Sequence, residues 1–570
     1  MKMLADRLRR FDLTPGRIAL LAALAVFFGA FLIYPLGYVL VSAFQDGEGH
    51  LTGQFIWLLV SDPQKWSIIL NSLNLGIAVT VVTTLLAVPL AYVMTRYTFR
   101  GKGILSGLVL VPMVLPPFVA AVGMKQMFAR FGSINLLLMK LGIISSAAPI
   151  DWFVGGGMLG VIILEVLHLY PIMYLTVAAA MANVDPGLEE AGRNVGASGF
   201  TLFRRITFPL MLPGYFAGAV IVFIWAFTDL GTPLIFEYRQ VVSVQIFDKL
   251  DNINDPMGYA LVLLMIVMTV AFFLLTKSVV GSKRYEMLAR GHVASGAKPA
   301  SRRLATAIYI GLLALTAVAL IPHISVLLMS FNERWFMTVL PSSYTFQHYS
   351  DVFTHPTTTR SVVNSLYLSG ASTFVDIFLG IGIAWLLART RIPGRNVIDA
   401  LTMLPLAVPG VIIAFGYLTG FSQTILNARV NPVPLLIIGY AVRRLPYMVR
   451  AAYAGFQQTS VTLEEAAHNV GAGPIRTLWR ITMPLVFANL IAGGILCFSF
   501  AMLEVSDSLI LASQEKFYPI TRAIYSLSQR LPDGPYIACA MGMLAMILLA
   551  VSLIIAGRFL GKRMGELFRV

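Results

Sequence analysis

Two polar stretches of almost the same sequence interrupt an otherwise apolar chain. The first, EEAGRNVGASGFTLFRRITFPL, runs from Glu189 to Leu210, and the second, EEAAHNVGAGPIRTLWRITMPL, runs from Glu464 to Leu485. Aligned without gaps, they share two glutamates, an alanine, an Asn-Val-Gly-Ala run and a closing Arg-Ile-Thr-x-Pro-Leu. A repeated polar helix in a hydrophobic chain predicts two matching docking sites for something outside the membrane.

Each polar stretch is typical of a short helix, a turn and a second helix that leads into an apolar segment. Asp185 followed by Pro186 predicts an N-cap and a proline in the first turn of the first copy. In the second copy we expect Thr462 to cap the helix, with Glu465 closing a capping box. Two glycines, Gly196 and Gly471, then permit the chain to reverse with little side-chain obstruction.

A second set of residues that could do chemistry lies inside the apolar segments. Ionisable side chains there cost about 2.5–3.5 kcal/mol each on insertion scales, so they usually face a cavity or a partner. We expect the fourth, fifth, tenth and eleventh spans to line a translocation pathway, with a local break at Gly231-Thr232-Pro233. The alternative is that the arginines among them form structural ion pairs with the acids. The candidate pathway residues are Glu165, His168, Asp229, Arg443, Arg444, Glu504 and Asp507.

The composition indicates a membrane protein. The chain of 570 residues is 58% hydrophobic and 12% charged, whereas a soluble domain carries about 25% charged residues. Apolar runs of 18 or more residues recur along it, as in helical membrane spans. The positive-inside rule explains the net charge of +15, so no nucleic acid partner is expected. Cys497 and Cys539 lie in apolar spans and have no disulfide or metal-ligand pattern.

The expected fold is an all-α polytopic membrane protein with about twelve transmembrane helices, arranged as two parallel six-helix repeats. The basic, polar stretch 283–303 reads as a cytoplasmic linker between a first repeat, 1–282, and a second, 304–570. Matching residues support the repeat, for example Arg96 with Arg389. The spans are expected at about 17–43, 67–94, 104–130, 156–182, 207–236 and 257–281, and at about 304–330, 361–388, 397–421, 433–456, 482–512 and 535–560.

The distribution of basic residues predicts the orientation of the spans. Clusters of Lys and Arg follow the second, fourth, sixth and eighth spans, which places both termini and both polar stretches in the cytoplasm. The loops 44–66 and 331–360 then lie outside. Their tryptophans suit the outer membrane interface, and they are Trp57, Trp66 and Trp335. The extra residues around Gly132–Asp151 suggest an outer loop or a short interfacial helix.

The polar stretches also carry a family pattern, E-A-A-x-x-x-G followed by I-x-x-P. Glu190-Ala191-Gly192 with Gly196 fits it in one half, and Glu465-Ala466-Ala467 with Gly471 fits it in the other. With this pattern the chain resembles permease subunits of bacterial ATP-binding-cassette (ABC) importers, and over nearly its whole length it looks like the fused double permeases of the ferric-iron and thiamine type. It departs from the pattern in having Gly192 where alanine is usual, and the second copy has Leu478 where the first has Phe203.

The resemblance implies partners and roles. In that family the polar loop forms a cytoplasmic coupling helix that fits a cleft in the ATPase, and closure of two ATPase subunits swings the membrane halves. The chain has no Walker A pattern, so the ATPase is expected to be a separate protein present in two copies. A periplasmic or lipid-anchored substrate-binding protein, membrane lipid and a bacterial inner (plasma) membrane location are implied too. The expected ATPase-docking residues are Glu189, Glu190, Ala191, Gly196, Glu464, Glu465, Ala466 and Gly471.

Several readings of the function compete. The first is an importer permease that forms the translocation pathway, with no catalytic residue, cofactor or bound metal of its own. A secondary transporter with duplicated six-helix halves is the alternative, while a membrane enzyme finds no supporting motif. For the cargo we expect ferric iron, with thiamine, a polyamine or a phosphonate or phosphorylated small molecule as alternatives. The deep acids favour a cation, whereas Arg443 and Arg444 favour an anion.

Overall fold

A computed structural model describes residues 14–153, 157–281, 297–530 and 532–560, and most of these residues are helical. They include one pair of two-residue parallel strands, β1 (Tyr97–Thr98) and β2 (Lys298–Pro299). Of the expected linker, 283–296 lies outside the described residues. Its remaining part holds β2 and Ser301, the N-cap of α16 (Arg302–Ser330).

Nine helices in the described ranges are long and apolar enough to cross a membrane, or eleven if two bent pairs each count as one span. The tenth expected span, 433–456, coincides with the helix α21 (Val433–Gln458). It is not among these nine or eleven, because each of its 18-residue windows contains three arginines. The nine are Pro15–Ser42 (α2, η1 and α3), Pro63–Arg96 (α5), Met158–Ala182 (α9), Gly199–Ile235 (α11 to α13), Pro256–Thr276 (in α15), α16, Pro356–Arg389 (α18), Leu478–Met502 (η4 and α24) and Gly534–Arg558 (in α27).

The third expected span of each half, at 104–130 and at 397–421, is a sharply bent pair of helical segments in the structure. The segment Lys102–Met113 (α6 and η2) meets Pro117–Lys140 (α7 and α8) at 88°, and α19 (Arg395–Ala407) meets α20 (Gly410–Gly420) at 100°. Prolines at matching places explain both bends, because proline lacks an N–H and cannot continue the helical hydrogen bonding. They are Pro112, Pro116, Pro405 and Pro409.

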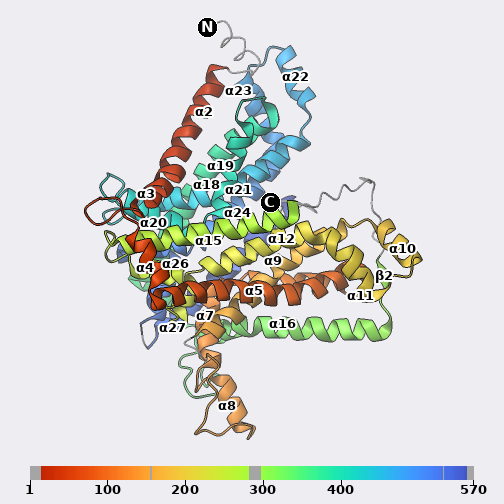
Figure 1. Ribbon diagram of the computed structural model, residues 1–570, viewed down its shortest axis with the longest axis vertical. Helices are drawn as coiled ribbons and strands as arrows, with labels where there is room; N and C mark the ends of the chain where they lie inside the picture. The colour runs from red at the N-terminus through yellow and green to blue at the C-terminus, as the bar shows by residue number, and fades with distance from the viewer. Residues whose placement is uncertain (1–13, 154–156, 282–296, 531, 561–570) are drawn as a thin grey trace.

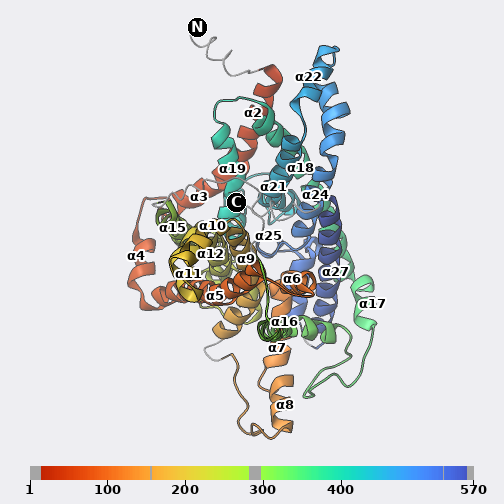
Figure 2. The same ribbon diagram turned by 90° about the vertical axis from the view of Figure 1, so that its right-hand side faces the viewer.

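The two halves interlock through their first helices (Figures 1 and 2). In Figure 1, α2 (Pro15–Phe28), from the start of the chain, runs along the second-half bundle, and α16 runs along the first-half helices. Hydrogen bonds join the halves at both places. The Tyr417 hydroxyl donates to the Phe31 carbonyl at 2.7 Å, and the Ser325 hydroxyl donates to the Gly123 carbonyl at 2.7 Å. The largest buried apolar cluster accordingly contains residues of both halves.

The loops between spans also contain short helices. The expected insertion forms α8 (Ser133–Lys140), which projects from the lower end of the molecule in Figure 1. The buried Asn135 holds this projection, since its side chain donates to the Ile150 carbonyl at 2.7 Å and accepts from the Trp152 indole at 2.9 Å. Trp335, one of the three tryptophans expected near the outer interface, packs inside the protein. Trp335 is buried and donates its indole N–H to the Thr338 carbonyl.

We expect Gly123→Val to loosen the contact between α7 and α16. A Cβ at Gly123 would lie 2.8 Å from Val326 Cγ2 and 3.0 Å from the Pro322 carbonyl oxygen, which forces a packed helix pair apart. Overpacking of this kind costs about 1–3 kcal/mol. Thermal melting of the detergent-purified protein measures the effect, with Gly311→Val as the control because Gly311 has open space around it in α16. Equal melting temperatures for the two variants would contradict this packing.

Candidate functional site

The two polar stretches fold alike. Each is a nine-residue helix, α10 (Pro186–Asn194) or α22 (Val461–Asn469), that is followed by a turn. Gly196 (φ 88°) and Gly471 (φ 85°) occupy the turns in the left-handed region, which glycine adopts without steric cost. The predicted role of both glycines in reversing the chain is therefore confirmed.

The N-caps agree with the sequence in one copy and differ in the other. Asp185 caps α10 as predicted, because its side chain accepts from the Gly187 N–H at 2.8 Å. The prediction for α22 was wrong. Ser460, with extended backbone, caps that helix and accepts from the Thr462 N–H at 3.3 Å, so Thr462 already lies inside the first turn. Ser460 and Thr462 both carry a hydroxyl group that can cap a helix, and the sequence alone did not show which of them is the N-cap.

Adjacent glutamates in α10 lie in different environments. Glu189 is 5% exposed and pairs with Arg96, the last residue of α5, while its Oε1 accepts the Thr207 hydroxyl at 2.8 Å. Arg193 lies 3.7 Å from its other oxygen. Glu190 is exposed.

The second copy repeats this arrangement. Glu464 is mostly buried, and its Oε1 accepts from Arg389 Nε at 3.0 Å and from the Thr482 hydroxyl at 3.2 Å. Arg389 is the last residue of α18 and also donates to the Thr459 carbonyl at 2.7 Å. Glu465 is exposed, like Glu190. The other predicted docking residues are exposed too, and they are Ala191, Gly196, Ala466 and Gly471.

The sequence reasoning missed the role of the arginines and threonines in these contacts. In the sequence, Arg96 and Arg389 serve as matching residues of the repeat and as members of the basic clusters that orient the spans, and neither use predicts a contact with a glutamate. Thr207 and Thr482 end short π-helical segments, η3 (Phe203–Thr207) and η4 (Leu478–Thr482). Each segment leads into the main helix of the fifth or eleventh span, α12 (Phe208–Thr228) or α24 (Met483–Met502), which has a proline in its first turn.

Two of the predicted pathway residues meet in the first half. The α12 helix ends at Thr228 and α13 (Gly231–Ile235) begins after a break at Asp229 and Leu230, two residues earlier than the sequence suggested. The Thr232 N–H donates to Asp229 Oδ2 at 2.8 Å, and the Thr232 hydroxyl donates to Glu165 Oε1 at 2.9 Å. Thr232 therefore joins two carboxyl groups from neighbouring spans.

The corresponding place in the second half holds cations. Arg443 and Arg444 of α21 form ion pairs with the two oxygens of Glu504, and Arg444 also donates to the Phe500 carbonyl at 3.1 Å. The ion-pair alternative is thus observed for Glu504, whereas among the described residues neither arginine pairs with Asp229 or Asp507. Asp507, in α25 (Ser506–Leu511), is fully buried, and neither carboxylate oxygen is hydrogen-bonded to another described residue.

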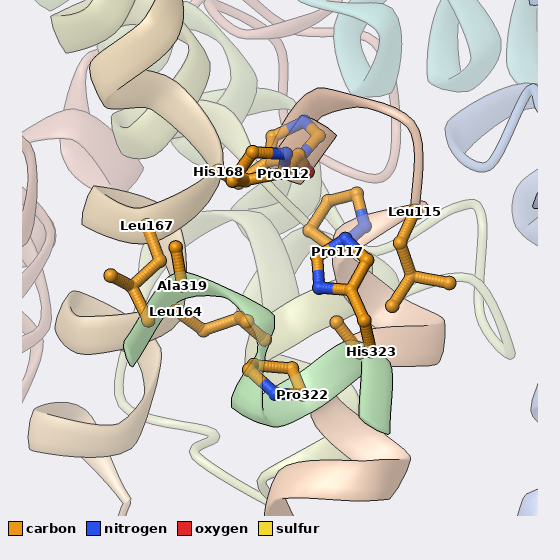
Figure 3. A pocket seen from close by; sticks show the side chains of 10 residues that line it. Pro112, Leu115, Pro117, Leu164, Leu167, His168, Ala319, Pro322 and His323 are labelled. Atoms are coloured by element: carbon orange, nitrogen blue, oxygen red, sulfur yellow. The ribbon is translucent and has the colours of Figure 1, made fainter. Parts of the chain in front are cut away.

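His168 lies apart from both clusters, in a small pocket between the halves (Figure 3). The pocket lies among η2 (Val111–Met113), α7 (Pro117–Phe128), α9 and α16, and its lining is apolar except for two imidazoles. His168 Nδ1 is 3.3 Å from the Pro112 carbonyl oxygen, and the second imidazole belongs to His323.

The sequence reasoning overlooked two ionisable residues inside the spans, His323 and Asp376. Asp376 is a fully buried acid of α18 and was visible in the sequence as a carboxylate in an apolar span. Among the described residues, no group of three or more His, Cys, Asp or Glu is arranged to hold a metal ion.

The fold and these sites define a class of protein, a membrane transport subunit built of two halves. Residues 84–282 and again 377–566 match the family model described as "Binding-protein-dependent transport system inner membrane component". The chain belongs to this family and is therefore a multi-pass inner-membrane permease subunit of an ABC importer, without catalytic function of its own. Membership favours the importer over a secondary transporter.

Curated relatives align along most of the chain or along about a third of it. A ferric transport system permease protein of Actinobacillus pleuropneumoniae is 26% identical over 93% of this chain and 76% of its own length. A putative ferric transport system permease protein of Haemophilus influenzae is 27% identical over 86% of this chain and 77% of its own. A molybdate/tungstate permease protein of Pyrococcus furiosus is 28% identical over 33% of this chain and 73% of its own. A solved bacterial ABC transporter involved in alginate import has 19% identity and a TM-score of 0.33, covering 46% of this chain and 98% of its own.

We expect Glu504→Gln to destabilise the protein more than Asp229→Asn. Removing the charge of the buried Glu504 leaves two partly buried arginines without their carboxylate, a loss that approaches the cost of about 3–5 kcal/mol typical of breaking a buried pair. Asparagine at 229 keeps an oxygen that accepts from the Thr232 N–H. Thermal melting in the same detergent compares the two variants with the parent. A larger loss for Asp229→Asn would show that the arginine pairs contribute little.

Proposed function

We propose that this chain is the fused double permease of a ferric-iron importer and that α10 and α22 each dock one ATPase subunit. The single observation that carries the proposal is the occurrence of the same exposed polar helix at matching places in both halves. One chain then receives both ATPase subunits, and together the two halves form the translocation pathway. The proposal includes repeats over 1–282 and 304–570 joined by the linker 283–303.

The surface of the polar helices supports docking. Val195 and Val470, at the ends of α10 and α22, are each 85% exposed, and an exposed glutamate lies one to two turns before each of them. An exposed apolar residue at the same place in both copies is suited to a protein partner. Of the eight predicted docking residues, six are exposed and would contact the ATPase. The other two, Glu189 and Glu464, lie on the inner side and hold each helix in place.

The basic loops support a cytoplasmic position for both docking helices and both termini. Arg96 and Arg389 end spans next to the polar helices, and positive charge concentrates on the cytoplasmic side of inner-membrane proteins. With α21 as a span despite its arginines, each half has six spans. The docking helices then face the compartment that contains ATP.

The candidate pathway residues Asp229 and Glu504 lie where the fifth and eleventh spans are broken, the first between α12 and α13 and the second between α24 and α25. Interrupted backbone inside a membrane is tolerated only beside protein or a water-filled cavity. Gly231, the first residue after the first break, has Val505 of the second break as a near neighbour, since a Cβ added at Gly231 would lie 3.2 Å from Val505 Cγ1. We therefore assign the route to the region between the two breaks, flanked by Glu165, Asp229, Arg443, Arg444, Glu504 and Asp507, with His168 in the neighbouring pocket.

Ferric iron is the proposed cargo because the ferric permease relatives align along most of the chain. The molybdate/tungstate relative aligns along a third of it. An oxyanion is the second candidate, favoured by Arg443 and Arg444. The test reconstitutes the chain in liposomes with its ATPase and binding protein and measures ATP-dependent uptake of ferric iron, molybdate and phosphate separately. Uptake of ferric iron alone supports the proposal, and uptake of an oxyanion alone overturns the cargo assignment.

We expect Glu190→Arg combined with Glu465→Arg to release the ATPase. Both side chains are exposed, so reversing their charge opposes a partner surface without disturbing the membrane helices. Co-purification of the ATPase and ATP-dependent uptake measure the result, with Asp251→Lys, an exposed acid in the loop before α15, as the matched control. The docking assignment fails if the double variant binds ATPase and transports like the control.

A further inference from the structure

The buried face of each polar helix carries the same three-residue contact, which we call the root cluster. The first root cluster consists of Arg96, Glu189 and Thr207, and the second of Arg389, Glu464 and Thr482. In each, a carboxylate accepts from an arginine that ends one membrane helix and from a threonine that directly precedes another. A single glutamate thereby joins the polar helix to two membrane spans.

The two root clusters are not a by-product of local sequence similarity. The arginine precedes its glutamate by 93 residues in the first half and by 75 in the second, because the first half contains the extra α8 region. The same contact among arginine, glutamate and threonine is nevertheless present in both halves. Contacts that persist despite different chain spacing point to a function of the contact itself.

Each polar helix therefore has two faces with different partners. Glu190 and Glu465 face outward, whereas the preceding residues, Glu189 and Glu464, face the membrane spans, since successive helical residues are about 100° apart. A buried ion pair is a poor general stabiliser but holds its elements in one geometry. A displacement of the outer face is thus passed to the ends of α5 and α12, or of α18 and α24.

We propose that Glu189 and Glu464 are positioning residues that transmit the movement of the docked ATPase to the membrane spans. The proposal rests on the proposed docking of α10 and α22 and assigns the two glutamates of each pair to separate tasks. The outer glutamate contributes to binding the ATPase. The inner glutamate couples that binding to transport.

The two root clusters differ in how strongly the arginine is held. Arg389 also donates to the Thr459 carbonyl and lies 5.8 Å from the Phe456 ring centre, so it keeps partners when Glu464 is neutralised. Arg96 has its hydrogen bond to Glu189, and its Nε is buried without a hydrogen-bond partner among the described residues. Neutralising Glu189 should therefore have the larger effect.

The test measures docking and coupling separately in the reconstituted complex of chain, ATPase and binding protein. Glu189→Gln and Glu464→Gln, singly and together, are compared with Glu190→Gln plus Glu465→Gln, and Asp251→Asn serves as the control. The readouts are the amount of co-purified ATPase and the number of ATP molecules hydrolysed per cargo molecule imported. The charge-swapped pair Arg96→Glu with Glu189→Arg is tested beside its two single variants.

We expect the inner double variant to keep its ATPase while the ratio of ATP hydrolysed to cargo imported rises about tenfold, within the range of allosteric couplings. The swapped pair should recover coupling that each single variant loses. An unchanged ratio in the inner double variant, or loss of ATPase equal to that of the outer variant, would overturn the assignment. If the parent chain itself binds no ATPase, the proposed function fails, and that result is distinct from failure of the root clusters alone.

Discussion

The buried contact between an arginine at the end of a span and a glutamate of the polar helix organises both halves of this protein. Glu189 with Arg96, and Glu464 with Arg389, hold each polar helix against the end of α5 or α18. Because an unpaired buried charge is costly, neither partner can leave without a replacement. The contact leaves the neighbouring glutamate free on the surface, so the same short helix can be anchored on one side and offered to a partner on the other.

The halves are most alike at their polar helices and least alike inside the spans. At matching places within the membrane, the first half has Glu165 and Asp229 joined by Thr232, and the second has two arginines on Glu504. Both halves nevertheless break the same span and keep a carboxylate at the break. This distribution suits a protein that meets two copies of the same ATPase at one end and conducts a single cargo between its halves.

Much of this was readable from the sequence, and the rest depended on tertiary packing. Motif, capping by Asp185, turn glycines and the broken fifth span follow from local chemistry. The different burial of Glu189 and Glu190 does not, because two adjacent glutamates look equivalent until the spans beside them are placed. The packing of α2 against the second half and of α16 against the first half was also not readable from the sequence, because it depends on tertiary contacts. The bends of 88° and 100° at Pro112 to Pro116 and at Pro405 to Pro409 depend on packing too, since the prolines break the helix but do not set the direction of the next segment.

The central claim is that one chain docks two ATPase subunits through two equivalent helices, and cross-linking tests it most directly. The native thiols, Cys497 and Cys539, are both buried, so a cysteine placed at the exposed Val195 or Val470 is the reactive one. A short bifunctional reagent is applied to the complex carrying Val195→Cys, Val470→Cys or both. The account predicts one ATPase subunit attached in each single variant and two in the double variant. A double variant that attaches one subunit, or none, would contradict it.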